Sequence, residues 1–153
     1  MRRGLLAGLA LLTTVVATPV TGAECNSGCM LAQVEHYFEA LDGVSRRGAT
    51  VDDVDRLLAL LHPAVRYVHV EYEADFGRAE WREAFLGNLE RGAYANGPEN
   101  EIRVLRSIPG KSHLAVEYSH GVVGDDGTWT AGESYLVLFT FTEGRISLVK
   151  ELW

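Results

Sequence analysis

Three ionisable side chains lie on otherwise apolar stretches, and they are the first candidates for chemistry. His69 alternates with Tyr67 along a stretch rich in β-formers, while His120 and Glu133 share the bulky faces of two later stretches. Imidazole can act as a general base near neutral pH. His69 is therefore either a proton-transfer group or a hydrogen-bonded structural histidine. Glu133 is either functional or salt-bridged, because a carboxylate on such a face is unfavourable unless it is paired or protonated.

Several classes of protein are not supported by the sequence. It has no H-x-H or H-E-x-x-H spacing, so a metal site made from His69, His120 and Glu133 is not predicted. It also lacks the G-x-S-x-G, P-loop and G-x-G-x-x-G motifs, and we therefore expect no cofactor. The formal net charge of −7 argues against binding to nucleic acid or to an anionic membrane surface.

The only two cysteines, Cys25 and Cys29, are four residues apart near the start of the chain. In an oxidising compartment their simplest use is a local disulfide. A redox site of the C-x-x-C type would need a different spacing, and two thiols without nearby histidines make a poor metal site. We therefore predict a Cys25–Cys29 disulfide.

The last 42 residues predict three consecutive strands, Ser112–Gly124, Thr128–Thr142 and Arg145–Trp153. Short Gly-containing turns join them, as in β-hairpins. A hairpin centred on residues 125–128 pairs residues near 120 with residues near 133, which predicts that His120 and Glu133 are close neighbours.

The elements before these strands must cover one face of the sheet. Apolar residues at helical spacing predict helices over about residues 30–44 and 51–61, and a third helix carries Trp81, Phe85 and Leu89. Strands are expected at 65–72 and 101–108, with a loop at 73–78. This order predicts an α+β domain over residues 24–153, with the helices on one face of an antiparallel sheet.

The first 23 residues have the layout of a secretory signal peptide. Arg2 and Arg3 precede an apolar run that ends in the small residues Thr21-Gly22-Ala23. The run is too short and too interrupted for a stable membrane anchor. We expect cleavage after Ala23 and export to the periplasm or the medium.

Four stretches together resemble the nuclear-transport-factor-2-like (NTF2-like) superfamily, especially its SnoaL-like branch. They are residues 34–41 on the first helix, 58–69 around the helix-to-strand turn, 77–85 at the third helix, and 143–153 at the closing strand. Each motif is weak alone, but their order and spacing cover almost the whole mature chain. The resemblance implies a cone in which a curved antiparallel sheet wraps around about three helices and encloses a pocket.

The resemblance also implies roles for two residues. Tyr37 is similar in position to the oxyanion-stabilising tyrosine of ketosteroid isomerase, although it also continues the apolar stripe of its helix. His69 falls where that enzyme has its catalytic aspartate, so the isomerase's own carboxylate is missing. The pocket is expected to be lined by Tyr37, Tyr67, His69, Trp81, His120, Glu133 and Tyr135.

Two functions remain open on this basis. The first is a cofactor-independent proton-transfer enzyme of the isomerase, cyclase or dehydratase type. In this enzyme His69 would be the base, Tyr37 would donate a hydrogen bond to the oxyanion, and Glu133 would orient or protonate the reacting groups. The second is an exported, non-catalytic binding or assembly module built on the same cone. Either would take a small apolar or polycyclic molecule, and the long open sheet favours a homodimer.

Overall fold

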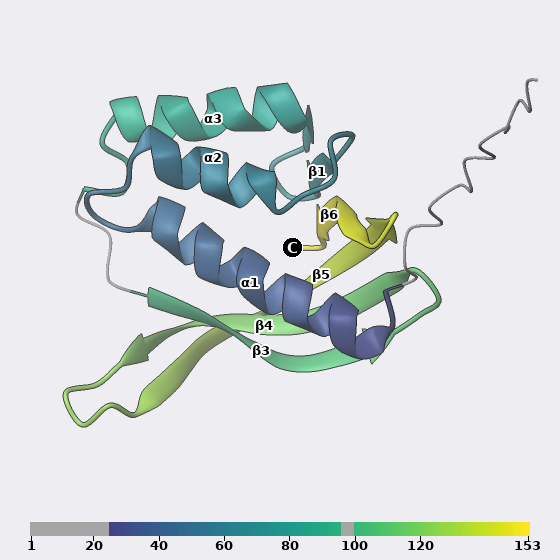
Figure 1. Ribbon diagram of the computed structural model, residues 1–153. Helices are drawn as coiled ribbons and strands as arrows, with labels where there is room; N and C mark the ends of the chain where they lie inside the picture. Colours follow the sequence, from purple (N-terminus) through teal and green to yellow (C-terminus); the bar gives the residue numbers. More distant parts are fainter. Residues whose placement is uncertain (1–24, 96–99) are drawn as a thin grey trace, which may run out of the picture.

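The computed structural model describes residues 25–95 and 100–153, which form one α+β unit (Figure 1). The predicted signal peptide lies outside the described residues. The described elements, in chain order, are α1 (Ser27–Ser45), α2 (Val51–Ala59), β1 (Arg66–His69), β2 (Ala74–Gly77), α3 (Arg78–Glu90), β3 (Asn100–Pro109), β4 (His113–Val123), β5 (Trp129–Thr142) and β6 (Arg145–Glu151). Within this part of the chain, no helix has the length and apolar character needed to cross a bilayer.

The strands form one open sheet in the order β2-β1-β6-β5-β4-β3. All neighbouring strands are antiparallel except β1 and β6, which run parallel. The predicted all-antiparallel sheet was therefore wrong in this one pairing. The parallel pair matters because it places β6, the last strand, inside the sheet between β1 and β5.

A sixth strand, β2, replaces part of the loop predicted at 73–78. The chain leaves β1 at His69 and turns at Glu73, which has a φ of 50°. It then returns antiparallel, with Phe76 opposite Tyr67. The aromatic pair and an ion pair between Arg66 and Asp75 stabilise a segment that has little strand propensity of its own.

The three helices lie on one side of the sheet, with α1 running across the long strands and α2 and α3 beyond it (Figure 1). Helix α1 begins where the Asn26 side chain accepts a hydrogen bond from the Cys29 backbone N–H. The predicted Cys25–Cys29 disulfide is present. Gln33 donates to the Gly144 carbonyl, which ties this end of α1 to the β5–β6 turn.

The core lies between α1 and the inner face of the sheet. Tyr37 and Phe38 of α1 both pack edge-on against Phe139 of β5, at centroid distances of 5.5 and 5.9 Å. Phe38 also meets Tyr118 of β4 at 4.8 Å. The predicted alternation is confirmed here, because Leu114, Val116, Tyr118, Val137 and Phe139 are all buried.

A β-bulge interrupts the pairing of β4 with β5. Ser119 pairs with Ser134, but Gly121 pairs with Ala131, so both Gly132 and Glu133 stand opposite His120. An extra residue in one strand shifts the following side chains to the other face of the sheet. Glu133 lies in this bulge and is exposed, as are all residues from 130 to 134, although an unbroken alternation would place it on the face that is buried at Val137 and Phe139.

We predict that Gly132→Ala destabilises the protein by about 1–3 kcal/mol. A Cβ at this position would lie 2.5 Å from the His120 carbonyl oxygen, so the backbone of the bulge would have to move. Gly43→Ala in α1 is the control, because a Cβ there meets nothing within 4 Å. That change should be neutral or stabilising by up to about 1 kcal/mol. Urea unfolding measures both, and equal stability of the two variants would contradict the prediction.

Candidate functional site

A cavity of about 260 Å³ opens between the helices and the β2-β1-β6 end of the sheet. Helices α1 and α3 supply most of its wall, and one residue each comes from β1, β2 and β6. Its lining residues are Tyr37, Leu41, Ser45, Tyr67, Phe76, Trp81, Ala84, Phe85, Asn88, Tyr94 and Glu151.

An aromatic wall gives this cavity its shape. Tyr67 of β1 stacks on Trp81 of α3, with ring centroids 4.6 Å apart and planes 18° from parallel. The ring centroid of Trp81 lies 5.8 Å from that of Phe85, and the ring centroid of Tyr67 lies 6.4 Å from that of Phe76. Rings that pack on one another lose little freedom when a ligand arrives, so the wall is a preformed apolar surface.

Among the described residues, Glu151 is the single acidic residue of the lining, and it is only 4% exposed. Its Oε2 atom accepts hydrogen bonds from the Tyr118 hydroxyl and the Trp153 indole N–H, each at 3.0 Å. The same indole N–H lies 3.1 Å from the Tyr118 oxygen, so the three groups form a closed triangle. Both donors act on one carboxyl oxygen, and no hydrogen bond from the described residues engages the other, Oε1.

Burial raises the pKa of Glu151 to about 7, although the hydrogen bonds from Tyr118 and Trp153 act in the opposite direction. A carboxyl with this pKa is present in both protonation states at neutral pH. It can therefore take a proton from a ligand and return it, as a general acid–base catalyst must.

Two tyrosines of the lining stay protonated beside this carboxyl. Burial is the largest cause that raises the pKa of Tyr37, and the nearby charge of Glu151 adds to it. The same two causes raise the pKa of Tyr67. Neutral phenols are hydrogen-bond donors, so either hydroxyl can support negative charge that develops on a ligand oxygen.

Of the seven residues predicted to line one pocket, the structure brings Tyr37, Tyr67 and Trp81 together in this cavity. Tyr135 and His120 lie elsewhere, in an aromatic group around Tyr118. The His120 ring is 5.8 Å from Tyr118 and 5.9 Å from Tyr135. Burial lowers the pKa of His120, which favours its neutral form.

His69 is buried but is not part of the cavity lining. Its ring stacks on Tyr72 at 4.1 Å and meets Trp153 at 4.4 Å. Burial lowers the pKa of His69, and the nearby Glu71 opposes this effect. His69 is therefore a neutral imidazole that contacts Trp153, one member of the Glu151 triangle, and it does not line the cavity.

Glu133 is exposed and does not line the cavity. Its carboxylate accepts a hydrogen bond of 3.4 Å from the hydroxyl of Tyr135. The expected closeness of His120 and Glu133 holds for their backbone positions, but the two side chains do not form a shared enclosed site.

Glu151 is the functional candidate that the sequence analysis did not single out. A signal was present: Val149 and Glu151 alternate along the closing strand, so a buried valine predicts an inward carboxyl two residues later. What the sequence could not show is that β6 is an interior strand. A glutamate near the end of an edge strand would simply be solvated.

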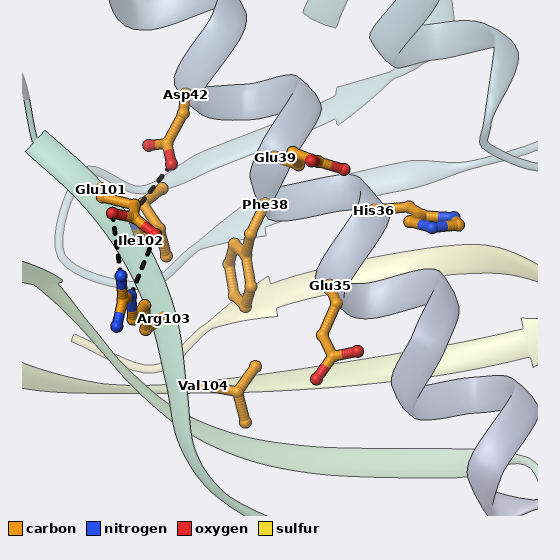
Figure 2. A pocket seen from close by; sticks show the side chains of 9 residues that line it. All are labelled: Glu35, His36, Phe38, Glu39, Asp42, Glu101, Ile102, Arg103 and Val104. Atoms are coloured by element: carbon orange, nitrogen blue, oxygen red, sulfur yellow. Dashed lines mark hydrogen bonds and ion pairs between the residues drawn. The ribbon is translucent and has the colours of Figure 1, made fainter.

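A second hollow, of about 360 Å³, lies between α1 and β3 (Figure 2). The Asp42 carboxylate extends from α1 and accepts a 2.9 Å hydrogen bond from the Ile102 backbone N–H, which fastens β3 to the helix. Burial raises the pKa of Asp42 to about 6. The one arginine of this groove, Arg103, is paired with Glu101. None of the residues predicted for the site lines this groove.

No cluster of three or more His, Cys, Asp or Glu side chains with metal-binding geometry occurs in the described part of the chain. The acidic residue of the main cavity is surrounded instead by hydroxyl and indole donors. Such donors suit a carboxyl that exchanges protons more than one that binds a cation.

No family model matches the sequence, and no curated protein matches it either. Solved structures do match. A candidate SnoaL-like polyketide cyclase from Jannaschia sp. CCS1 has a TM-score of 0.54 and 15% identity, covering 91% of this chain and 90% of that one. An LEH-like epoxide hydrolase from Mycobacterium tuberculosis has a TM-score of 0.54 and 16% identity, covering 81% of each chain.

A third neighbour comes from Catenulispora acidiphila and has a ketosteroid isomerase-like fold, with trimethylamine bound. Its TM-score is 0.52 at 13% identity, and the match covers 83% of this chain and 85% of that one. These likenesses show the fold. The described residues have an NTF2-like α+β fold, with three helices against a six-stranded mixed sheet that does not close.

The buried carboxyl predicts a specific pH dependence of stability. Because the folded-state pKa of Glu151 is raised, its contribution is most favourable below its usual pKa and is lost as the pH rises toward 7 and beyond. Glu151→Gln has no such loss. Between pH 5 and pH 8, we expect the unfolding free energy of the parent to fall by about 1–3 kcal/mol relative to that of Glu151→Gln. Urea unfolding at both pH values measures this, and a pH-independent difference would contradict it.

Proposed function

We propose that this chain is a SnoaL-like small-molecule enzyme that transfers protons without a cofactor, and that Glu151 is its acid–base group. The observation that carries the proposal is the half-engaged carboxyl. One oxygen of Glu151 is fixed by Tyr118 and Trp153, while the residue lines an aromatic cavity and titrates near pH 7. A fixed carboxyl with a pKa near the operating pH is what proton transfer at carbon needs.

The reaction is written most simply for a ligand with a carbonyl group. The Glu151 carboxylate takes a proton from the carbon next to the carbonyl, and the C–H electron pair moves to form an enolate. The Tyr37 hydroxyl donates a hydrogen bond to the enolate oxygen and remains protonated. The Glu151 carboxylic acid then returns its proton to another atom of the ligand. The result is an isomerisation where the proton returns to a different carbon of a conjugated enolate. It is a cyclisation where the enolate carbon attacks a second carbonyl carbon of the same ligand, whose C=O π bond breaks and whose oxygen takes the proton.

The lining also limits the class of ligand. It contains no Lys, Arg or His, so a carboxylate or phosphate would meet Glu151 with no opposing charge. The aromatic wall favours a flat, partly apolar molecule, and the cavity volume limits its buried part to a small ring system. We therefore propose an uncharged cyclic carbonyl compound as the substrate class.

This proposal changes two roles that the sequence suggested. Glu151 takes the place of His69 as the base, because Glu151 lines the cavity and His69 does not. Glu133 has no part in the reaction, because its side chain is exposed. Tyr37 keeps the role of oxyanion donor, and Tyr67 and Trp81 keep that of ligand-binding residues.

The second candidate function is a non-catalytic binding module that uses the same cavity. It is favoured by the neighbour of similar fold that holds trimethylamine, a small molecule whose binding does not imply turnover. The two functions differ in whether Glu151 exchanges a proton with the bound molecule.

The test uses cyclic and steroid-like ketones in D₂O, with exchange of the α-hydrogens followed by NMR. We predict that Glu151→Gln lowers the exchange rate by about 100-fold or more and that Tyr37→Phe lowers it by about 10- to 1,000-fold. Both variants should still bind the ketone. Glu83→Gln is the control, since this exposed carboxyl on α3 is outside the lining. Binding without exchange by the parent protein would favour the binding module, and exchange that survives Glu151→Gln would exclude the proposed base.

We also propose that the chain is exported, loses residues 1–23 and associates as a homodimer. The disulfide supports an oxidising compartment. The exposed Ile108 and Leu136 support association through the sheet. Native mass spectrometry of protein recovered after secretion should give a dimer whose subunits begin at Glu24 and contain no free thiol. A full-length subunit would contradict cleavage, and a monomer at micromolar concentration would contradict the dimer.

A further inference from the structure

We propose that His69 is a positioning residue that holds the Trp153 indole against Glu151 through an N–H···π contact. The inference rests on the proposed function, because it matters to the protein only if Glu151 transfers protons. It concerns a different residue, however, and the geometry that supports it does not depend on any ligand.

The backbone places His69 directly beside the carboxyl without opening it to the cavity. His69 and Glu151 are register partners in the parallel pair β1–β6. Beyond the ends of these strands, the Glu71 N–H donates to the Trp153 carbonyl at 3.2 Å. This bond holds Trp153 next to the turn that follows β1. The indole contacts both groups: its ring is 4.4 Å from the imidazole, and its N–H donates to the Glu151 carboxyl at 3.0 Å.

The ring positions show which side of the imidazole meets the indole. His69 stacks on Tyr72 at 4.1 Å with planes 21° apart, so Tyr72 lies above the imidazole face. Trp153 is 4.4 Å from His69 and 6.1 Å from Tyr72. The three ring centroids therefore form a triangle with a nearly right angle at His69. Because Tyr72 lies above the imidazole face, the indole lies in the direction of the imidazole edge.

The plane angle then identifies the surface of the indole that is met. The His69 and Trp153 planes are 79° apart, and a centroid distance of 4.4 Å is too short for two rings that touch edge to edge. The imidazole edge therefore points at the indole face. The indole N–H edge is free for its hydrogen bonds to Glu151 and Tyr118.

The hydrogen-bond pattern of His69 fits this arrangement. Its Nδ1 atom accepts from the Tyr72 backbone N–H at 3.4 Å, so the neutral ring carries its proton on Nε2. The Nε2 atom is buried and has no hydrogen-bond partner among the described residues. A buried N–H without an acceptor is unfavourable, and the π-face of the Trp153 indole acts as the acceptor for the Nε2–H group.

The consequence for Glu151 follows from the indole orientation. The Trp153 N–H stabilises the ionised carboxyl and so restrains the rise of its pKa. If the indole turned away, Glu151 would stay protonated to higher pH and would be a poorer base at neutrality. The groups around His69 are Tyr67, Glu71, Tyr72, Trp153 and its register partner Glu151, and Glu71 is the charged group that acts to raise the pKa of the imidazole. Burial outweighs its effect, so the imidazole stays neutral and the contact persists at neutral pH.

The first test uses the unmodified protein labelled with ¹⁵N. We expect the His69 imidazole to be the Nε2–H tautomer at pH 7, with its Nε2 proton shifted strongly upfield by the ring current of Trp153. An Nδ1–H tautomer, or an Nε2 proton without the upfield shift, would overturn the proposal. This measurement needs no variant and no substrate.

The second test compares His69→Phe with His113→Phe, an exposed histidine at the start of β4. Phenylalanine keeps the stacking ring and removes the N–H. We expect His69→Phe to raise the pKa of Glu151, read from its side-chain ¹³C resonance, by about half a unit or more, and to shift the Trp153 indole N–H signal. Trp153→Phe should raise that pKa by at least as much, and His113→Phe should leave it unchanged.

An unchanged pKa of Glu151 in His69→Phe would overturn the positioning role. The outcome is separable from the proposed function. If the pKa rises while Glu151→Gln retains exchange activity, the proton-transfer assignment fails and the positioning role stands. If Glu151→Gln is inactive but the pKa of Glu151 does not move in His69→Phe, the proton-transfer assignment stands and the positioning role of His69 fails.

Discussion

The enclosure of one carboxyl group is the constraint on which the rest of this site depends. Glu151 is almost fully removed from water, and an ionised carboxylate in that position needs donors. Tyr118 and Trp153 provide two, and both act on the same oxygen. This arrangement satisfies one oxygen of the carboxyl and leaves the other without a hydrogen bond from the described residues. A fully satisfied carboxylate would be a structural group, and an unsatisfied one would remain protonated.

The position of β6 in the sheet makes this enclosure possible. Because β6 pairs with both β1 and β5, Glu151 has a strand on each side and the helices above it. The parallel pairing with β1 also brings Tyr67 to the cavity and His69 to its outer side. One pairing thus supplies an aromatic wall residue, the carboxyl, and the imidazole that borders the indole. The short strand β2 completes the wall with Phe76.

The site combines rigidity with an unfavourable electrostatic element. The stacked rings of Tyr67, Trp81 and Phe85 give the cavity a packed aromatic wall. Against this, the raised pKa of Glu151 means that its ionised form destabilises the folded state near and above neutral pH. Strain of this kind is expected where a group must be reactive, and the aromatic core between α1 and the long strands offsets it.

The sequence by itself determined the parts of this protein that depend on local patterns. Alternation predicted the long strands β4 and β5 and their buried faces, helical spacing predicted α1 and α2, and the four-residue separation predicted the Cys25–Cys29 disulfide. It also predicted that Tyr37, Tyr67 and Trp81 share a pocket, because each lies on the apolar side of its own element and the order of elements resembles a known fold.

The tertiary structure decided which ionisable groups reach that pocket. Alternation predicted that Glu133 faces inward, but Glu133 lies at a bulge in a part of β5 where residues 130–134 are all exposed. His69 had the right chemistry, yet the turn after β1 stacked it on Tyr72, outside the lining. Glu151 became important only because β6 pairs parallel with β1, a contact between residues about 80 positions apart. Bulges and long-range pairings depend on how distant segments meet, and local periodicity carries no information about that.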